Sequence, residues 1–345
     1  MNPAIPRPTL GPSPAQPYPH AHRLVQIPER IPYPCDPPAS GAMRDDILEG
    51  FFAPQKRIDS KYLYDARGSQ LFEQICRQPE YYPARAETGL LENAAPALAA
   101  RLSFNARLVE LGSGASEKTR LLLEAAPHIT SYVPLDISKD ALAWASQALA
   151  IDYPGLHIGP RQADFTNGGV LASCSMGFGS LLFLPGSTLG NFAPPEASRL
   201  MRSWAADCAG GTLFLVGIDL VKDVPTLVRA YDDAAGVTAL FNLNLLARLN
   251  REFDANFELD NFEHRAVWNA QESCIEMHLV SKVGHLVDAA GARLRFDRLE
   301  TIHTESSYKY RPEEFVALAE RSGWGFEEFW ISEKPEFGLF LFRAA

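Results

Sequence analysis

A Gly-x-Gly turn follows an apolar run in the stretch "LVELGSGASEKTR". Gly112 and Gly114 form the turn, Glu110 stands before it, and Glu117 and Lys118 follow. A dinucleotide pyrophosphate needs three glycines and a bare helix N-terminus, because backbone amides and the helix dipole stabilise its negative charge. The third glycine is missing here, and two carboxylates near the turn would repel a pyrophosphate. The turn therefore favours a ligand with cationic groups and no phosphate.

Two acidic residues further along the chain extend this pattern. Asp136 ends "SYVPLD", where a carboxylate can accept hydrogen bonds from ribose hydroxyls. Asp164 and Phe165 lie in "RQADFTN", where an acid can accept from an adenine amino group and a ring can cover the base. S-adenosylmethionine, with a sulfonium, an ammonium and no phosphate, suits these groups. Each feature alone also has a structural reading as a tight turn or a helix cap, but together they favour a class I methyltransferase.

Other stretches carry groups that could hold a second substrate. The small-residue loop "GSTLGN" ends at Asn191, whose amide can donate and accept, although it also suits a helix N-cap. Tyr81 in "PEYYPAR", Tyr231 in "LVRAYDD" and Glu305 in "HTESSYKYRPEE" add tyrosines and a carboxylate. Tyrosines in such places are equally typical of half-buried core positions with one polar tip. Composition alone leaves both interpretations open.

The elements that must position these groups alternate between strand and helix. Strands are predicted over 107–111, 131–135, 156–162, 180–184 and 212–218, with helices over 116–126, 138–150 and 193–209. This rhythm predicts an α/β fold with a mostly parallel, doubly wound, Rossmann-like sheet. After helices over 224–250, strands are predicted at 264–269, 274–282 and 294–301. The final helix, over 312–322, and two last strands predict a C-terminal antiparallel pair.

Composition excludes several classes of protein. The net charge of −10 without a Lys/Arg cluster argues against a nucleic-acid partner. No apolar run is as long as a membrane span, and a signal-peptide pattern is absent. The five scattered cysteines form no C-x-x-C pair and the histidines no H-x-x-x-H pair. No metal site is therefore expected, and a reducing cytoplasm is the expected compartment.

Taken together, five long motifs resemble the histidine-specific methyltransferase family, which trimethylates the α-amino group of L-histidine to hercynine in ergothioneine biosynthesis. The resemblance runs from about Phe51 to the C-terminus. The motifs are "YLYDARGSQLFEQICRQPEYYPAR", "VELGSGASEKTR", "GSTLGN", "DLVKD…LVRAYDDAAGVTALFN" and "ESSYKYRPEE". The resemblance implies a monomeric enzyme whose ligands are S-adenosylmethionine and L-histidine. One departure is Pro185 at the start of the substrate loop, which fixes the chain direction there.

The resemblance also implies roles for individual residues. The positions that match the S-adenosylmethionine site are Tyr64, Gly112, Lys118, Asp136, Asp164 and Phe165. The positions that match the histidine site are Tyr81, Asn191 and Tyr231 for the backbone groups, Glu305 and Ser307 for the imidazole, and Met277, Phe72 and Phe241 as pocket walls. Transfer by alignment requires no dedicated catalytic residue, and none is predicted.

These expectations divide the chain into three parts. Residues 1–42 are predicted to form a Pro-rich flexible leader. Residues 86–222 and 306–345 are expected to bind S-adenosylmethionine, and residues 43–85 and 223–305 to form an α+β substrate-binding domain. The alternatives are a methyltransferase for another amino acid or small amine, an NAD-dependent oxidoreductase, and a non-catalytic binding module.

Overall fold

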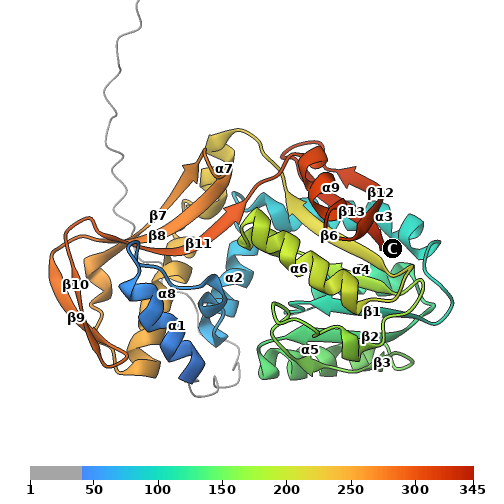
Figure 1. Ribbon diagram of the computed structural model, residues 1–345, viewed down its shortest axis with the longest axis horizontal. Helices are drawn as coiled ribbons and strands as arrows, with labels where there is room; N and C mark the ends of the chain where they lie inside the picture. The colour runs from blue at the N-terminus through green and yellow to red at the C-terminus, as the bar shows by residue number, and fades with distance from the viewer. Residues whose placement is uncertain (1–40, 115) are drawn as a thin grey trace, which may run out of the picture.

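The computed structural model describes residues 41–114 and 116–345. Its central element is an eight-stranded sheet with the order β12-β13-β6-β5-β1-β2-β3, in which β4 also pairs with β2 (Figure 1). Strands β1 to β6 pair in parallel, whereas β13 runs antiparallel to β6 and β12. The strands are Ala106–Leu111 (β1), Ile129–Asp136 (β2), His157–Ile158 (β3), Arg161–Gln162 (β4), Leu181–Leu184 (β5), Leu213–Asp219 (β6), Trp324–Ile331 (β12) and Phe337–Ala344 (β13). The predicted mostly parallel sheet with an antiparallel pair is confirmed.

Helices cover both faces of this sheet because side chains alternate along each strand. In β6, Leu213 and Leu215 belong to the apolar core shared with α3 and α4, whereas Phe214 and Val216 belong to the core shared with α6 and α9. The helical elements of this part are α3 (Tyr82–Ala99), α4 (Glu117–Ala125), α5 (Lys139–Asp152), η2 (Ala172–Cys174), η3 (Thr188–Asn191), α6 (Pro194–Asp207) and α9 (Pro312–Glu320). Burial on two faces makes the sheet doubly wound.

A second group of elements packs around its own core, in which rings of Phe51, Phe241 and Phe296 are buried. It contains a three-stranded antiparallel sheet, a two-stranded hairpin and helices. The elements are α1 (Gly41–Phe52), η1 (Ser60–Leu63), α2 (Ala66–Cys76), α7 (Val224–Tyr231), α8 (Val237–Phe253), η4 (Leu259–Asn261), β7 (Phe262–Asn269), β8 (Cys274–Ser281), β9 (His285–Ala289), β10 (Ala292–Phe296) and β11 (Thr301–Tyr308). Figure 1 shows this group beside the central sheet. The predicted domain boundaries stay predictions, and the one after residue 305 falls within β11.

Two predicted strands are wrong in their bounds. The strand expected over 294–301 contains a turn: β10 ends at Phe296, the amide of Glu300 bonds to the carbonyl of Asp297 (3.1 Å), and Leu299 has a φ of +70°. The strand that follows begins at Thr301 and includes Glu305 and Ser307. The strand expected over 156–162 splits into β3 and β4, because Pro160 between them has no N–H to donate.

The predicted leader, residues 1–42, lies outside the described residues except for its last two, which begin α1. None of the helices in the described ranges has the length and apolarity that a bilayer crossing demands. Within the same ranges, no group of three or more His, Cys, Asp or Glu side chains is placed to hold a metal ion.

Candidate active site

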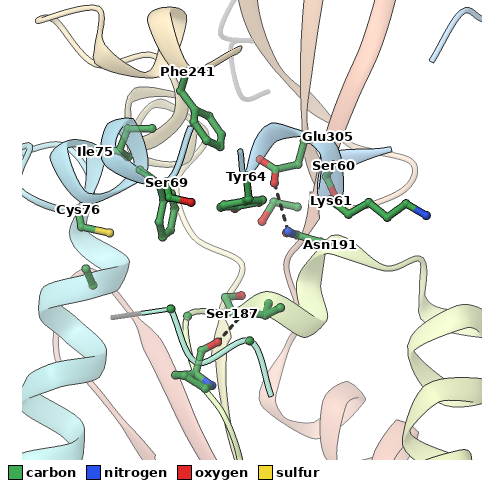
Figure 2. Close-up of a pocket in the computed structure, with 18 of the residues that line it drawn as sticks. Ser60, Lys61, Tyr64, Ser69, Ile75, Cys76, Ser187, Asn191, Phe241 and Glu305 are labelled. Atoms are coloured by element: carbon green, nitrogen blue, oxygen red, sulfur yellow. Dashed lines mark hydrogen bonds between the residues drawn. The ribbon is translucent and has the colours of Figure 1, made fainter. Parts of the chain in front are cut away.

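A cavity of about 1240 Å³ lies between the carboxyl ends of the central parallel strands and the second group of elements. Figure 2 shows Tyr64, Asn191, Phe241 and Glu305, from four separate segments, around the same space. Every residue predicted from the sequence to bind cofactor or substrate lines this cavity. These residues are Tyr64, Phe72, Tyr81, Gly112, Lys118, Asp136, Asp164, Phe165, Asn191, Tyr231, Phe241, Met277, Glu305 and Ser307.

The glycine turn has a backbone shape that other residues rarely adopt. The φ angles of Gly112 and Gly114 are +69° and +47°, and a Cβ at position 112 would lie 3.6 Å from the ring of Phe165. The N–H of Gly114 donates to Oδ2 of Asp136 at 3.1 Å. An amide that could face a pyrophosphate is therefore already paired with a carboxylate. The turn suits a ligand without phosphate.

The two acids predicted to meet an adenosine group lie at this edge with Phe165. Burial raises the pKa of Asp136 above its usual value. Asp164 accepts hydrogen bonds from the amide and the hydroxyl of Thr166, at 2.9 and 2.5 Å. The backbone carbonyl of Phe165 accepts from the indole N–H of Trp204 at 3.1 Å, and their rings meet edge to face. These contacts fix the orientation of both acidic groups and of the ring.

Glu110, before the turn, is held largely by protein groups. Its buried carboxylate accepts from the hydroxyl of Thr119 at 2.5 Å and from the hydroxyl of Tyr132. Burial raises the pKa of Glu110 to about 7, although both hydrogen bonds lower it. The carboxyl group thus ties β1 to β2 and α4, and it titrates near neutral pH.

Lys118, after the turn, pairs with Glu87 of α3. The side chain of Glu87 has no exposed surface, and its two oxygens also accept from the N–H of Gly186, at 3.0 and 2.8 Å. The side chain of Lys118 remains 23% exposed. Its ammonium can therefore meet an anionic group in the cavity while staying anchored. Glu87 was not predicted from the sequence, because one acid within a helix has no distinguishing signal.

Aromatic rings form one wall of the cavity. Tyr64 meets Phe72 and Phe241 edge to face, each with ring centroids 5.5 Å apart. Tyr81 meets Phe72 at 6.0 Å and Tyr231 at 6.2 Å. Edge-to-face pairs of this kind stabilise one another and keep the rings in place. The π-systems of these packed rings suit a cationic group.

Glu305 lies opposite this wall. Its Oε1 accepts from Nδ2 of Asn191 at 3.2 Å, which joins β11 to η3 (Figure 2). Met277 is the neighbour of Glu305 across the β8–β11 ladder. Burial raises the pKa of Glu305 to about 7, against the opposing influence of Lys309 and Asn191. A carboxyl group that lines a cavity can accept a further hydrogen bond from a ligand there.

Comparison with known proteins identifies the family. Residues 43–344 match the model of the histidine-specific, S-adenosylmethionine-dependent methyltransferases. The chain is 42% identical to a histidine N-alpha-methyltransferase of Mycolicibacterium smegmatis, over 88% of this chain and 95% of that protein. It is 39% identical to a protein of the same name from Mycobacterium tuberculosis, over 87% and 94%. An L-tryptophan methyltransferase of Psilocybe serbica is 26% identical over 88% and 93%.

This chain belongs to the histidine-specific methyltransferase family. It is therefore an S-adenosylmethionine-dependent N-methyltransferase, which rules out the oxidoreductase and the non-catalytic module. The cavity fits the cofactor that the family uses, because the amide of Gly114 is closed off by Asp136 and an anchored ammonium lies nearby at Lys118. The roles of the individual residues stay predictions.

Behind the cavity of this family member lies a buried charge network that was not predicted from the sequence. Asp219 ends β6 with no exposed surface, and its carboxylate lies 2.9 Å from Nζ of Lys309 and 2.6 Å from Nζ of Lys222. The hydroxyl of Tyr82 donates to the same carboxylate at 2.8 Å. Burial raises the pKa of Asp219, but the two ammonium groups outweigh it and hold the pKa below its usual value.

A signal for this network was present in the sequence. Asp219 is the one charged residue in the apolar strand "LFLVGID", and a buried acid requires a cationic partner. Lys309 lies in the polar stretch "HTESSYKYRPEE", where a single lysine has no distinguishing signal. Nothing in the sequence pairs these two positions, because Asp219 ends β6 of the central sheet, whereas Lys309 directly follows β11 of the three-stranded sheet.

Proposed function

We propose that the protein transfers three methyl groups to the α-amino nitrogen of L-histidine and so produces hercynine, the first step towards ergothioneine. The observation that carries this proposal is the pair formed by Glu305 and Ser307, two buried polar side chains that line the same cavity. Residues i and i+2 of a strand point to the same face, about 6.6 Å apart along it. That spacing suits one small polar ring held at both ends.

The remaining substrate contacts follow from the positions around this pair. Asn191, Tyr81 and Tyr231 are proposed to hold the amino and carboxylate groups of histidine. Met277, Phe72 and Phe241 are proposed to enclose the ring, with their apolar surfaces excluding water. A site that hydrogen-bonds a polar ring rejects amino acids without one, because its buried groups would stay unpaired.

The cofactor is proposed to bind beside the glycine turn. S-adenosylmethionine, when bound, supplies an electrophilic methyl group at its sulfonium. Asp136 is proposed to accept from ribose hydroxyls and Asp164 from the adenine amino group, with Phe165 and Tyr64 covering apolar surface. Lys118 is proposed to meet the methionyl carboxylate by a charge-assisted hydrogen bond. Gly112 lets that ligand approach the backbone closely.

The protein's main contribution is alignment. Each transfer needs a neutral amine, so the ammonium group of the free amino acid loses one proton to solvent before each of the three methyl groups arrives. Holding the amine in line with the methyl group converts a bimolecular reaction into an effectively unimolecular one. The aromatic wall supports repeated transfer, because π-faces stabilise the quaternary ammonium that forms last.

We also propose that one chain suffices and that it acts in the cytoplasm. Residues of one chain form both the proposed cofactor subsite and the proposed substrate subsite. Scattered cysteines without paired spacing are typical of proteins kept reduced.

The proposal is tested by incubating the protein with S-adenosylmethionine and each of the common amino acids, then weighing the products by mass spectrometry. Histidine is expected to gain three methyl groups, and Nα-acetylhistidine, whose amine is blocked, none. Methylation of another amino acid in place of histidine would favour the alternative of a different substrate on the same scaffold and would refute the proposed one.

A further inference from the structure

The ammonium of Lys309 uses every hydrogen it has. Its side chain has no exposed surface. Nζ lies 2.9 Å from Oδ2 of Asp219, and it donates to the hydroxyl oxygens of Tyr231 at 2.9 Å and Ser307 at 2.8 Å. A protonated lysine has three N–H donors and no acceptor. Each donor has one acceptor, so the direction of all three hydrogen bonds is fixed.

These directions determine the next hydrogen bond. The hydroxyl of Tyr231 accepts from Lys309, and its single proton is donated to Oγ of Ser307 at 2.7 Å. Ser307 thus accepts two hydrogen bonds, one from Lys309 and one from Tyr231, which occupy both lone pairs of its oxygen. Among the described residues, its own proton has no acceptor, and the side chain lines the cavity. That proton is therefore available to a ligand in the cavity.

Asp219 keeps Lys309 protonated, so the directions of these hydrogen bonds do not change. Burial lowers the pKa of Lys309, but the charge of Asp219 and the contact with Tyr231 outweigh it and raise the pKa above its usual value. The lysine therefore stays protonated and stays a donor. A second ammonium, that of Lys222, contacts the same carboxylate but donates to Tyr82 and not to Ser307.

We propose that Lys309, held by Asp219, is a positioning residue that fixes the hydroxyl of Ser307 as a hydrogen-bond donor to the substrate ring. The site then selects a ring that has a nitrogen lone pair for Ser307 and an N–H for Glu305. This inference rests on the proposed function, since it assigns the ring of the substrate to this pair.

The site pairs one hydrogen-bond acceptor, Glu305, with one donor, Ser307, and this combination determines which rings fit. Neutral imidazole offers one N–H and one lone pair, which matches Glu305 as acceptor and Ser307 as donor. Imidazolium offers two N–H groups and leaves the Ser307 proton without an acceptor. Indole offers an N–H and no lone pair, and a phenyl ring offers neither. An unpaired buried donor is unfavourable, so each of these rings is disfavoured.

The test compares substrates of nearly equal shape. Thiazol-4-yl-alanine and thiazol-5-yl-alanine each place a lone-pair nitrogen at one of the two ring positions of histidine, whereas thienylalanine has none. For the wild-type protein, kcat/KM for the better thiazole is expected to exceed that for thienylalanine at least about tenfold. Ser307→Ala and Lys309→Met are both expected to reduce this ratio to within about threefold.

Matched variants distinguish a loss of Ser307 orientation from a general loss of stability or activity. Lys222→Met removes the other ammonium on Asp219 and is expected to keep the wild-type ratio, and Lys309→Arg is expected to restore much of it. If Lys309→Met destabilises the fold, the ratio is measured in the triple variant K309M/D219N/K222M, which removes all three charges of the network. Circular dichroism confirms folding in each case.

The outcomes are distinct. A wild-type protein that methylates histidine but shows no thiazole preference overturns the inference alone. So does a Lys309→Met variant that keeps the wild-type ratio. A wild-type protein that leaves histidine unmethylated refutes the proposed function instead.

Discussion

The ammonium of Lys118 contacts the carboxylate of Glu87, which also accepts from the amide of Gly186. Lys118 belongs to the helix after the glycine turn, and Gly186 begins the loop that leads to Asn191. One buried carboxylate therefore joins the proposed cofactor subsite to the proposed substrate loop. Its loss would affect both.

Lys118→Met is expected to weaken S-adenosylmethionine binding at least about tenfold, because a charge-assisted hydrogen bond is lost. It is also expected to destabilise the fold by about 3 kcal/mol, since Glu87 stays buried without its cation. The double variant K118M/E87Q should recover stability but not affinity. Titration calorimetry and thermal unfolding measure the two effects. Wild-type affinity in the double variant would show that Lys118 does not hold the cofactor.

Glu305→Ala is expected to lower kcat/KM for histidine about 100-fold or more, because a ring N–H loses its buried acceptor. The preference for histidine over phenylalanine should shrink with it. Glu305→Gln keeps an oxygen that can accept, so its loss should be smaller. Steady-state kinetics with both amino acids checks the prediction. An alanine variant that keeps the wild-type preference would mean that Glu305 does not touch the ring.

Two buried carboxyl groups make stability depend on pH. Burial raises the pKa of Glu110 and of Glu305 to about 7, above the ordinary value of 4.5. Between those values the folded protein binds more protons than the unfolded chain, so the free energy of unfolding falls as pH rises and levels off above about pH 7. Each group contributes a slope of up to about 1.4 kcal/mol per pH unit.

Urea unfolding from about pH 5 to about pH 8 measures that slope. Glu110→Gln is expected to reduce the slope of unfolding free energy against pH by the contribution of one carboxyl group. Glu124→Gln, an exposed change on α4, serves as the control and should leave the slope unchanged. Equal slopes in the wild-type protein and the Glu110→Gln variant would contradict the raised pKa.

Gly217→Ala is expected to destabilise the protein by about 3 kcal/mol or more, because overpacking a buried site forces neighbours apart. The new Cβ would lie 1.8 Å from Oε1 of Glu87, which is fixed by Lys118 and Gly186. Gly89→Ala is the control: nothing lies within 4 Å of its Cβ, and it sits within α3. Alanine there should stabilise the helix by about 0.5–1 kcal/mol. Similar losses of unfolding free energy in both variants would contradict the steric argument.

Much of the central sheet could be predicted because its strands are apolar and separated by regular helices. The glycine turn and Asp136 mark the carboxyl ends of β1 and β2, which lie side by side. The bounds of β11 could not be predicted from pattern. Its polar residues, Glu305 and Ser307, face a cavity, and strand patterns treat such residues as solvent-exposed ends.

Some cavity positions could be assigned only by resemblance, because their local pattern does not distinguish them from core or surface residues. These are Tyr64, Phe72, Phe241, Met277 and Ser307. The ion pair between Lys309 and Asp219 could not be predicted, because these residues are distant in the sequence and meet only in the folded structure. Local sequence patterns predict the face of an element on which a side chain lies, but they do not predict which distant residue it contacts.

Strand β13 lies between β6 and β12, and all its residues except Arg343 are buried. It is the latest of the described strands along the chain, while its neighbour β6 precedes the whole of α7 to β12. During synthesis on the ribosome, the edge of β6 that pairs with β13 therefore stays unpaired while those later residues are added. Such long-range pairing makes folding slow and leaves an apolar edge open to aggregation. The nascent chain is thus prone to aggregate through this edge until β13, which ends at residue 344, pairs with β6.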